Sequence, residues 1–358
     1  MNCFIRFGAL LLTLIIIACG PFERTELSST PEALQASSVT IMTLNVQNLF
    51  DNLDDPGKDD KAYLPLKAKQ NQAHKDACSQ IKVANWRREC LELDWSDAAL
   101  AHKMSVLAKV IRQVADGQGA DVIALQEVEN EYVLEQLRTG YLAELGYHKS
   151  VLIEGTDKRG IDVAFLSKLP LVGTPTLHPL VISTHSERAK DTRGILEAQF
   201  RMPDGTTLTG FAVHFPAPYH PTAMRVAAYR HLQSLRQALS VDDLVFAAGD
   251  FNTTSTEDER EGLLDKMVRP YWEVAHDDCA DCRGTYYYAP DDNWSFLDMI
   301  LVSRVQADSA GWRIRSGSVQ IANSLPEQST QGRPARYRAS ARSGASDHWP
   351  LILTLQKQ

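Results

Sequence analysis

The 358-residue chain carries 37 lysines and arginines against 45 aspartates and glutamates, which gives a formal net charge of −8. This balance excludes a broad basic footprint for nucleic acid. No internal repeat and no linker beyond residue 38 is visible. Residues 39–358 are therefore long for one domain but not too long for a large two-layered α/β unit.

The first segment of the chain predicts export. Residues 1–8 are short and carry Arg6, and residues 9–17 are almost continuously apolar. This apolar run is too short to span a bilayer and is typical of the hydrophobic region of a secretory signal peptide. We therefore expect residues 1–18 to be a signal peptide.

The signal peptide is followed by a cysteine. The stretch Ile16-Ile17-Ala18-Cys19-Gly20 resembles the lipobox of bacterial lipoproteins. The resemblance implies cleavage before Cys19, acylation of its thiol and new amine, and a membrane anchor. Glycine rather than aspartate at the next position implies sorting to the outer membrane. The alternative is an ordinary signal peptide with an incidental cysteine.

A change of composition follows Cys19. Up to residue 38 the chain is rich in Ser, Thr, Pro, Glu and Gln and has little to bury, which predicts a flexible tether over residues 19–38. A flexible chain of this length reaches on the order of 25 Å. Such a tether would hold the folded residues 39–358 clear of a membrane surface.

Four cysteines remain beyond Cys19, namely Cys78, Cys90, Cys279 and Cys282. In an oxidising compartment, the simplest prediction pairs them in sequence order, Cys78 with Cys90 and Cys279 with Cys282. The alternative is a four-cysteine zinc site. One Cys-x-x-Cys supports that site weakly, and the spacing of Cys78 and Cys90 argues against it.

Hydrophobic periodicity predicts the elements of the fold. An amphipathic stripe predicts a helix over residues 98–114, and a second helix is expected over 221–239, with Pro221 in its first turn. Strands mixed with helices in this way predict an α/β sandwich with the helices outside. Apolar or β-branched runs predict strands at residues 39–46, 121–125, 161–166, 206–213, 244–249, 294–302 and 349–355.

One long segment does not fit this alternation. Residues 51–97 are polar and charged and contain no clear strand. We expect them to form an insertion that covers or borders one edge of a functional site.

Polar side chains stand at the ends of six predicted strands, where core packing would favour apolar residues. Any one of them is more often a strand-end cap or a satisfied polar group than a catalyst. Six in one chain predict a shared site, because functional residues gather on loops held by a rigid scaffold. These residues are Asn45, Glu127, His214, Asp250 with Asn252, Asp298, and Asp347 with His348.

Three of these strand ends carry recognisable motifs. The sequences Leu125-Gln126-Glu127, Gly249-Asp250-Phe251-Asn252 and Ser346-Asp347-His348-Trp349-Pro350, in this order, resemble the endonuclease/exonuclease/phosphatase superfamily. That group includes deoxyribonucleases, apurinic endonucleases, sphingomyelinases and inositol-polyphosphate phosphatases. The resemblance implies a four-layered sandwich in which two mixed β-sheets pack face to face between helices.

The same resemblance implies a magnesium-dependent phosphoesterase. Mg²⁺ is expected, with Mn²⁺ or Ca²⁺ as alternatives, because the site residues offer oxygen ligands. Glu127 would be the principal metal ligand, and Asp347 a second ligand or a close outer-shell carboxylate. Asp250 would orient and deprotonate the attacking water, and Asn45 would position Asp250 and the waters on the metal.

The remaining motif residues would contact the phosphate. Asn252 would donate to a non-bridging oxygen, and His348 would contact the phosphate while a carboxylate fixes its tautomer. Asp298 is our candidate for that carboxylate. His214 would be a second imidazole facing the phosphate, and the sequence does not reveal its partner.

Other polar residues carry weaker signals. Arg159 and Arg193 could contact an anion at the rim, although surface ion pairs are the more common role for such arginines. Arg225, in the predicted helix after His214, could reach the same mouth. The run Tyr286-Tyr287-Tyr288 could stack on bases or form an aromatic edge strand.

Three functions are compatible with these features. We favour an exported, surface-anchored nuclease that acts on DNA or RNA as a monomer. The second is a sphingomyelinase-like enzyme or a lipid or inositol phosphate hydrolase. Against it, the chain has no long apolar hairpin that could insert into a bilayer. The third is a non-catalytic surface-binding module, which the intact set of site residues argues against.

Overall fold

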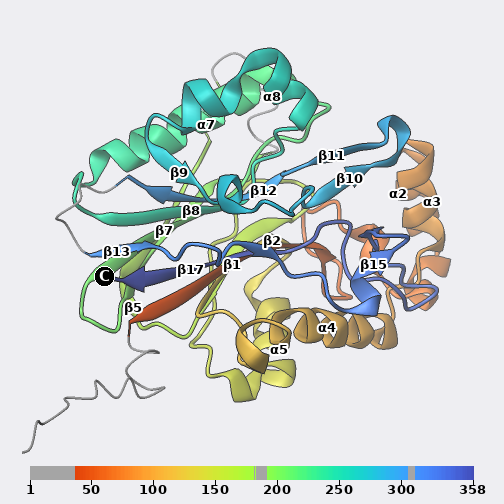
Figure 1. Ribbon diagram of the computed structural model, residues 1–358. Helices are drawn as coiled ribbons and strands as arrows, with labels where there is room; N and C mark the ends of the chain where they lie inside the picture. The colour runs from red at the N-terminus through yellow and green to blue at the C-terminus, as the bar shows by residue number, and fades with distance from the viewer. Residues whose placement is uncertain (1–36, 181, 183–191, 305–310) are drawn as a thin grey trace, which may run out of the picture.

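The computed structural model describes residues 37–180, 182, 192–304 and 311–358. The predicted signal peptide, Cys19 and most of the tether lie outside the described residues. Two β-sheets pack face to face, and helices cover the outer face of each sheet (Figure 1). This arrangement confirms the predicted four-layered α/β sandwich.

The first sheet contains seven strands, which are β1 (Ser38–Leu49), β2 (Val122–Val128), β3 (Val151–Leu152), β4 (Asp162–Ser167), β13 (Trp312–Ile314), β14 (Gln320–Ile321) and β17 (Leu351–Lys357). Their order is β13-β17-β1-β2-β4-β3, and β14 also pairs with β17. β1 and β2 are parallel, whereas β17 and β4 flank this pair in antiparallel register. The sheet is therefore mixed, with one parallel pair at its centre.

The second sheet repeats this plan with six strands, which are β5 (Leu171–His178), β6 (Ile195–Arg201), β7 (Thr207–His214), β8 (Leu244–Asp250), β9 (Trp272–Val274) and β12 (Asp298–Ser303). Their order is β5-β6-β7-β8-β12-β9. β7 and β8 are the parallel pair, and β6 and β12 flank it in antiparallel register.

Helices and two small hairpins complete the fold. The helices are α2 (Gln72–Ser79), α3 (Ala84–Glu92), α4 (Asp97–Arg112), α5 (Glu131–Tyr141), α7 (Thr222–Ala238) and α8 (Ser255–Glu261). The hairpins pair β10 (Tyr286–Tyr288) with β11 (Asn293–Ser295) and β15 (Ser329–Thr330) with β16 (Arg333–Pro334). Among the described residues, no helix has both the length and the apolar character needed to cross a membrane.

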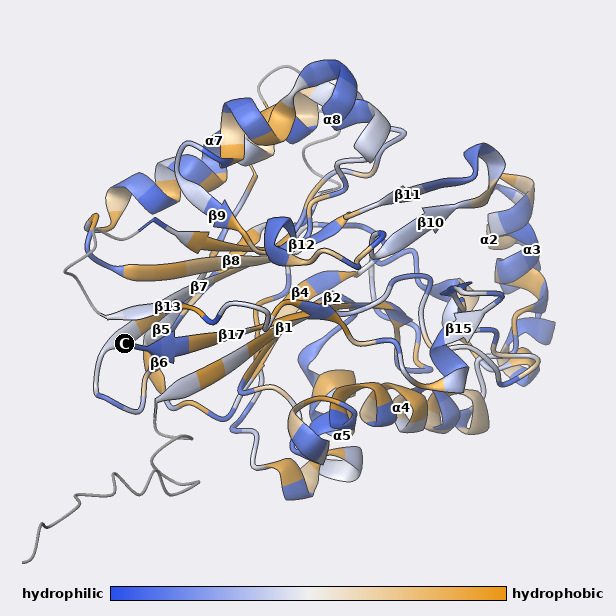
Figure 2. Ribbon diagram, in the orientation of Figure 1, coloured by the Kyte–Doolittle hydropathy of each residue, from blue (hydrophilic) through white to orange (hydrophobic). Residues whose placement is uncertain are grey.

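The core lies in three apolar layers between these elements, and the central strands are apolar along most of their length (Figure 2). Neighbouring residues of β1 show the pattern, since Ile41 packs between the two sheets and Met42 packs against the layer under α4 and α5. Both are fully buried because side chains alternate across a strand that is covered on both faces. Burial of each such side chain is worth roughly 1.5–3 kcal/mol.

Most predicted elements are present, but one predicted strand is divided and some observed elements were not predicted. The run 294–302 was expected to be one strand, but it divides into β11 and β12, which belong to different sheets. The backbone leaves the sheet because Ser295 pairs with Tyr286 in the small hairpin, whereas pairing with β8 begins only at Asp298. The edge hairpin of β5 and β6 was not predicted at all.

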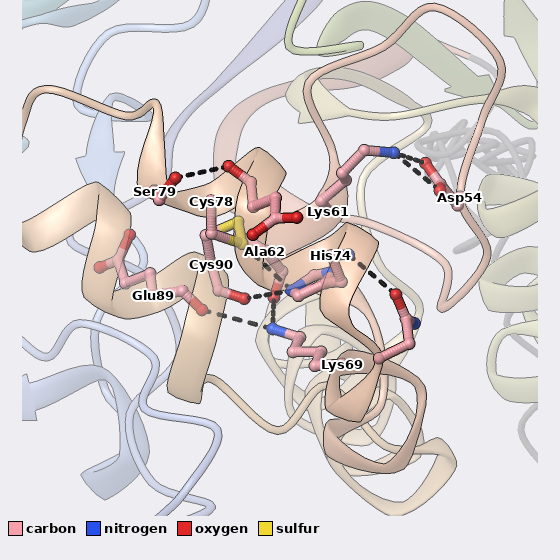
Figure 3. Close-up of a disulfide and its surroundings, with 11 residues drawn as sticks. Asp54, Lys61, Ala62, Lys69, His74, Cys78, Ser79, Glu89 and Cys90 are labelled. Carbon is pink, nitrogen blue, oxygen red and sulfur yellow. Dashed lines mark hydrogen bonds and ion pairs between the residues drawn. A yellow bond between two sulfur atoms is a disulfide. The ribbon is translucent and has the colours of Figure 1, made fainter.

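The insertion at residues 51–97 contains helices and no strand. A disulfide joins Cys78 of α2 to Cys90 of α3, and His74 Nε2 lies 2.8 Å from the carbonyl oxygen of Cys90 (Figure 3). The second predicted disulfide, Cys279–Cys282, is also present. Both pairings are confirmed, and the zinc alternative is excluded for these cysteines because their thiols are oxidised.

Candidate active site

The predicted site residues come together where the two parallel strand pairs end. Asn45 on β1 lies beside Glu127 at the end of β2, and His214 on β7 pairs in register with Asp250 on β8. The carboxyl ends of parallel strands meet at the same edge of a sheet. Because the two sheets pack face to face, each sheet contributes half of the cluster.

Asn45 links the two halves. Its Nδ2 lies 3.3 Å from Glu127 Oε1 and 3.2 Å from Asp250 Oδ2, while its Oδ1 accepts a hydrogen bond from the backbone N–H of Gln47 at 2.9 Å. Both protons of the carboxamide thus point at carboxylates that belong to different sheets. The predicted position of Asn45 between the metal ligand and the base is consistent with this geometry.

The backbone is bent sharply at this edge. Glu127 and Asn252 adopt φ of 66° and 52°, a left-handed conformation that is costly for residues other than glycine. Gly249 has a φ of 152°, and a Cβ added there would lie 2.0 Å from the carbonyl oxygen of Val213. Only glycine fits before Asp250, so the Gly-Asp-x-Asn motif has a steric as well as a chemical basis.

His348 and Asp298 form a buried pair. His348 Nδ1 lies 2.7 Å from Asp298 Oδ2, as the sequence predicted, and Asp298 lies opposite Asp250 on the neighbouring strand. Burial alone would lower the pKa of His348, but the charge and hydrogen bond of Asp298, with smaller contributions from Asp250 and Asp347, raise this pKa to about 10. His348 is therefore an imidazolium at neutral pH.

The loop that carries His348 is fixed on one side to β1 and on the other to Thr285, the residue before β10. Ser346 Oγ donates to the carbonyl oxygen of Asn45 at 2.7 Å and accepts from the backbone N–H of His348 at 3.1 Å. On the other side, Trp349 donates its backbone N–H to Thr285 at 2.8 Å. Hydrogen bonds on both sides of His348 therefore hold its ring beside Asp298.

His214 has the opposite charge preference. Its Nε2 lies 3.5 Å from Asp250 Oδ2, which answers the question of its partner, and its buried Nδ1 has no hydrogen-bond partner. Burial lowers the pKa of His214 well below its usual value, and the nearby cations Arg193, Arg159 and His348 lower it further. His214 is therefore a neutral imidazole.

The surroundings of Asp250 have opposing effects on its pKa. Burial raises its pKa to about 7, the charges of Asp298 and Glu127 act in the same direction, and the cation on His348 opposes them. A carboxylate with a pKa near the working pH is well suited to accept a proton. The site thus places a proton acceptor between a cationic and a neutral histidine.

Asn252 is held at the ends of β7 and β8. Its Nδ2 donates to the carbonyl oxygen of Phe215 at 3.0 Å, and its backbone N–H donates to Asp250 Oδ1 at 2.9 Å. Arg193 donates to the same carbonyl at 3.1 Å and to Asp157 Oδ2 at 3.2 Å. One proton of the Asn252 carboxamide is therefore engaged, and the other has no acceptor among the described residues.

The carboxylates fit a divalent cation. Glu127 accepts hydrogen bonds from Asn45 and from the backbone N–H of Asn48, but no lysine, arginine or histidine of the described residues forms an ion pair with it. A half-buried carboxylate without a cationic partner is a suitable oxygen ligand. Asp347 pairs with Arg336 at 3.2 Å, which favours the outer-shell alternative for Asp347.

Three other residues beside Glu127 also place possible metal-ligand atoms close together. Oxygens or nitrogens of Asp250, Asp298 and His348 lie within 4.8 Å of one another. We attribute this cluster to the His348–Asp298 ion pair next to Asp250, since a protonated imidazole has no lone pair for a metal. Glu127 therefore remains the main candidate ligand.

Two expectations for arginines are wrong. Arg193 is not at the surface, because only 5% of it is exposed and it pairs with the buried Asp157. Arg225 does not reach the mouth of the site, because its guanidinium is fully engaged by Glu257 and by carbonyls of the loop after β7. Arg159 is exposed and lies 3.8 Å from the same buried Asp157, so only one partner of this ion pair is at the surface.

Three residues near the site were not predicted from the sequence. Arg336 faces Asp347, and Lys103 of α4 is fully buried with its Nζ 2.7 Å from the carbonyl oxygen of Ala345. Tyr63 lies in the insertion, close enough to Glu127 for that charge to contribute to its raised pKa, after burial as the main cause. The insertion thus borders the site, and no motif marked any of these residues.

Comparisons with known proteins agree with the geometry. The profile of a family described as "Endonuclease/Exonuclease/phosphatase family" matches residues 89–357. A sequence search of curated proteins found no match.

Solved structures share the fold at low sequence identity. A Beutenbergia cavernae endonuclease/exonuclease/phosphatase is 15% identical, with a TM-score of 0.54 over 90% of this chain and 72% of that one. A Bacteroides thetaiotaomicron family protein is 14% identical, with a TM-score of 0.53 over 90% and 98%. TDP2 from Caenorhabditis elegans is 15% identical, with a TM-score of 0.52 over 89% and 75%.

Proposed function

Because the chain belongs to the endonuclease/exonuclease/phosphatase family, we propose that it is an exported metal-dependent phosphodiesterase that cleaves nucleic acid at the cell surface. The observation that carries the hydrolytic part is the chain of contacts from Glu127 through Asn45 to Asp250, with the His348–Asp298 pair beside it. It combines a carboxylate for a metal, a proton acceptor and a cation in one buried cluster.

The residues divide the chemistry of hydrolysis among them. Asp250 accepts the proton of the attacking water, and Asn45 holds Asp250 in place. His348 offers a positive charge to the phosphate, where negative charge grows in the transition state. Asn252 and neutral His214 would hydrogen-bond phosphate oxygens. Mg²⁺ held by Glu127, when bound, would neutralise charge on the phosphate and lower the pKa of a water.

His348 is protonated and Asp250 is assigned as the base, so direct attack by water is the simplest route. Activity should therefore require a divalent cation. We expect full loss of turnover in chelator and recovery with Mg²⁺. Turnover in metal-free buffer, with metal absent by elemental analysis, would contradict the assignment.

The choice of nucleic acid is supported by the surroundings of His348. The ring of Tyr286 lies 4.9 Å from the His348 ring, and Arg333 lies 3.9 Å above the ring of the neighbouring Tyr287. Aromatic and guanidinium planes beside a phosphate site suit the stacking of bases. The tip of this hairpin is Pro290-Asp291-Asp292, which does not suit insertion into lipid.

Turnover of plasmid DNA, RNA, sphingomyelin and inositol phosphates by the purified protein, with and without Mg²⁺, tests the substrate. Cleavage of DNA or RNA alone supports a nuclease. Release of phosphocholine or inorganic phosphate without nucleic acid cleavage would favour the lipid or inositol phosphate alternative.

We also propose that the protein is a lipoprotein anchored through Cys19. Fractionation of a diderm host that expresses the protein tests this anchor. The basis is the lipobox-like sequence alone. We expect a Cys19→Ser variant to leave the membrane fraction. If this variant fractionates with membranes as the parent does, the anchor is not the acylated cysteine.

A further inference from the structure

A second group of carboxylates lies outside the catalytic cluster. The loop after β1 carries five aspartates between residues 51 and 60. Two of them, Asp55 and Asp60, approach Glu129, which follows the end of β2. One carboxylate oxygen from each of the three lies within 4.8 Å of the others.

Asp60 and Glu129 are buried without a counter-charge, and Asp55 is half-buried. Asp60 is 0% exposed and Glu129 is 3% exposed. One oxygen of each accepts a backbone N–H, from Asp55 at 2.8 Å and from Asp51 at 2.7 Å, whereas Asp60 Oδ1 and Glu129 Oε1 are buried and accept no hydrogen bond.

No cation within the described part of the chain balances them. The nearest lysines in sequence are engaged elsewhere, since Lys58 donates to the carbonyl of Asp157 and Lys61 pairs with Asp54. Buried carboxylates normally pair with a cation or coordinate a metal, because removing a charge from water is costly. Two unpartnered, buried oxygens in one acidic cluster are therefore candidate ligands for a positive ion.

We propose that Asp55, Asp60 and Glu129 form a calcium site that is separate from the catalytic metal. Calcium binds carboxylate oxygens at 2.3–2.6 Å, so two oxygens on one ion lie at most about 5 Å apart. The observed separations satisfy this limit. Magnesium dehydrates reluctantly and keeps several waters, which suits a buried site with three carboxylates less well.

The position of this site gives the ion a structural task. Asp55 and Asp60 belong to the insertion, whereas Glu129 is attached to β2 two residues beyond Glu127. The backbone N–H of Glu129 donates to Leu49 at 3.0 Å, so the ends of β1 and β2 already touch here. Calcium would join the insertion to the strand that presents the catalytic carboxylate.

Calcium binding to the purified full-length chain tests this site. The test starts from a Glu127→Gln variant, so that the catalytic metal site is weakened and contributes little to the binding measured. Asp60→Asn is then added to this variant. Isothermal titration with Ca²⁺ should show that Asp60→Asn removes one equivalent of binding or weakens it at least tenfold. Extracellular calcium modules bind with a Kd of about 0.1–1 mM, which sets the concentrations to use.

Asp54→Asn in the same background is the matched control, because Asp54 lies in the same loop but pairs with Lys61 at the surface. It should retain the calcium equivalent. Asp55→Asn, at a half-buried ligand, provides a second variant if Asp60→Asn does not fold. Calcium should raise the melting temperature of the Glu127→Gln protein and not that of the Asp60→Asn double variant. Unchanged stoichiometry and affinity in both ligand variants would overturn the proposal.

Discussion

His348, His214 and Asp250 lie in one buried cluster but differ in their charge near neutral pH. The surroundings of each histidine explain the difference, since His348 has a carboxylate at 2.7 Å, whereas burial and, to a smaller extent, nearby cations lower the pKa of His214. A fixed imidazolium can stabilise a phosphate without giving up its proton, whereas Asp250, with a pKa of about 7, can accept one. We therefore expect the three residues to respond differently to substitution.

Asp250→Asn should lower kcat/KM by a factor on the order of 10² or more, because the carboxamide cannot accept the proton. Its melting temperature should equal or exceed that of the parent. Burial already disfavours the charged carboxylate, so the neutral side chain removes repulsion from Asp298 and Glu127. Steady-state kinetics and thermal melting of the same preparation check both expectations. Asp242→Asn, at an exposed carboxylate, should change neither.

His348→Ala should cost both activity and stability. It leaves Asp298 buried without its cation, and breaking a buried pair in this way costs about 3–5 kcal/mol. A His348→Ala protein with near-normal turnover and unaltered melting would show that the pair has neither role.

The pH dependence follows from the same three pKa values. His214 stays neutral and His348 stays charged through the neutral range, so Asp250 alone among them titrates there. Protonated Asp250 cannot act as the base, so kcat/KM should rise with pH along a limb of unit slope that ends at or below about pH 7, since a bound cation lowers this pKa. A profile measured at saturating Mg²⁺ that shows no such limb down to about pH 4, the usual pKa of an aspartate, would contradict Asp250 as the base.

At the residue scale, the sequence revealed the groups that stand at strand ends. An apolar run that stops at Asp250 or Glu127 is visible because the strand is buried on both faces. Arg336 and Lys103 gave no such signal. Their positions depend on how a loop and a helix pack against the end of β1, which periodicity does not encode.

Among the secondary-structure elements too, the sequence pattern reveals some, whereas others depend on tertiary packing. Central strands such as β1 and β8 were predictable because both of their faces are buried. β5 (Leu171–His178) was missed because none of its residues is buried at the sheet edge, so it lacks an apolar pattern. β6 does alternate, with Leu196, Ala198 and Phe200 buried, and this signal could have been found. The break between β11 and β12 falls at Phe296-Leu297, between the polar residues Ser295 and Asp298 of an otherwise apolar run, and the strand pairing reveals it.

The β10–β11 hairpin carries a prediction of its own. If Tyr286 stacks on a base beside His348, Tyr286→Ala should raise the KM for single-stranded nucleic acid by about tenfold or more, since one stacking contact is worth roughly 1–3 kcal/mol. The kcat should change less, because Tyr286 makes no contact with Asp250. Tyr132→Ala, at an exposed tyrosine on α5, is the control. An unaltered KM would exclude stacking by this hairpin.

At the scale of the whole molecule, the site depends on the packing of the two sheets. Glu127 and Asn45 belong to one sheet, and Asp250, His214 and Asp298 belong to the other. The apolar layer between the sheets therefore aligns the metal ligand with the base. Because Glu127 and Asp250 belong to different sheets, their like charges come close only when the sheets pack. In the packed structure, Asn45 donates a hydrogen bond to each of these carboxylates.

The net charge of −8 bears on the last prediction, that the substrate is a nucleic acid. Affinity for such a polyanion must come from local groups such as His348, Arg336 and Arg159, because the chain has no broad basic surface. Each phosphate contact releases counterions and contributes about −0.7 to −0.9 to the slope of log affinity against log salt. At fixed Mg²⁺, the KM for DNA or RNA should therefore rise with monovalent salt along a slope of at least about one.

A lipid with a neutral headgroup, such as sphingomyelin, should show little salt dependence and serves as the comparison substrate. Arg336→Gln should reduce the slope for nucleic acid by about one if Arg336 contacts a phosphate, and Arg260→Gln, at an exposed arginine paired with Glu261, should not. Absence of DNA and RNA cleavage at low salt, together with clear release of phosphocholine or inorganic phosphate, would reject the nuclease. The assignment of Glu127 and Asp250 would survive that result, because it depends on phosphoester chemistry and not on which alcohol leaves.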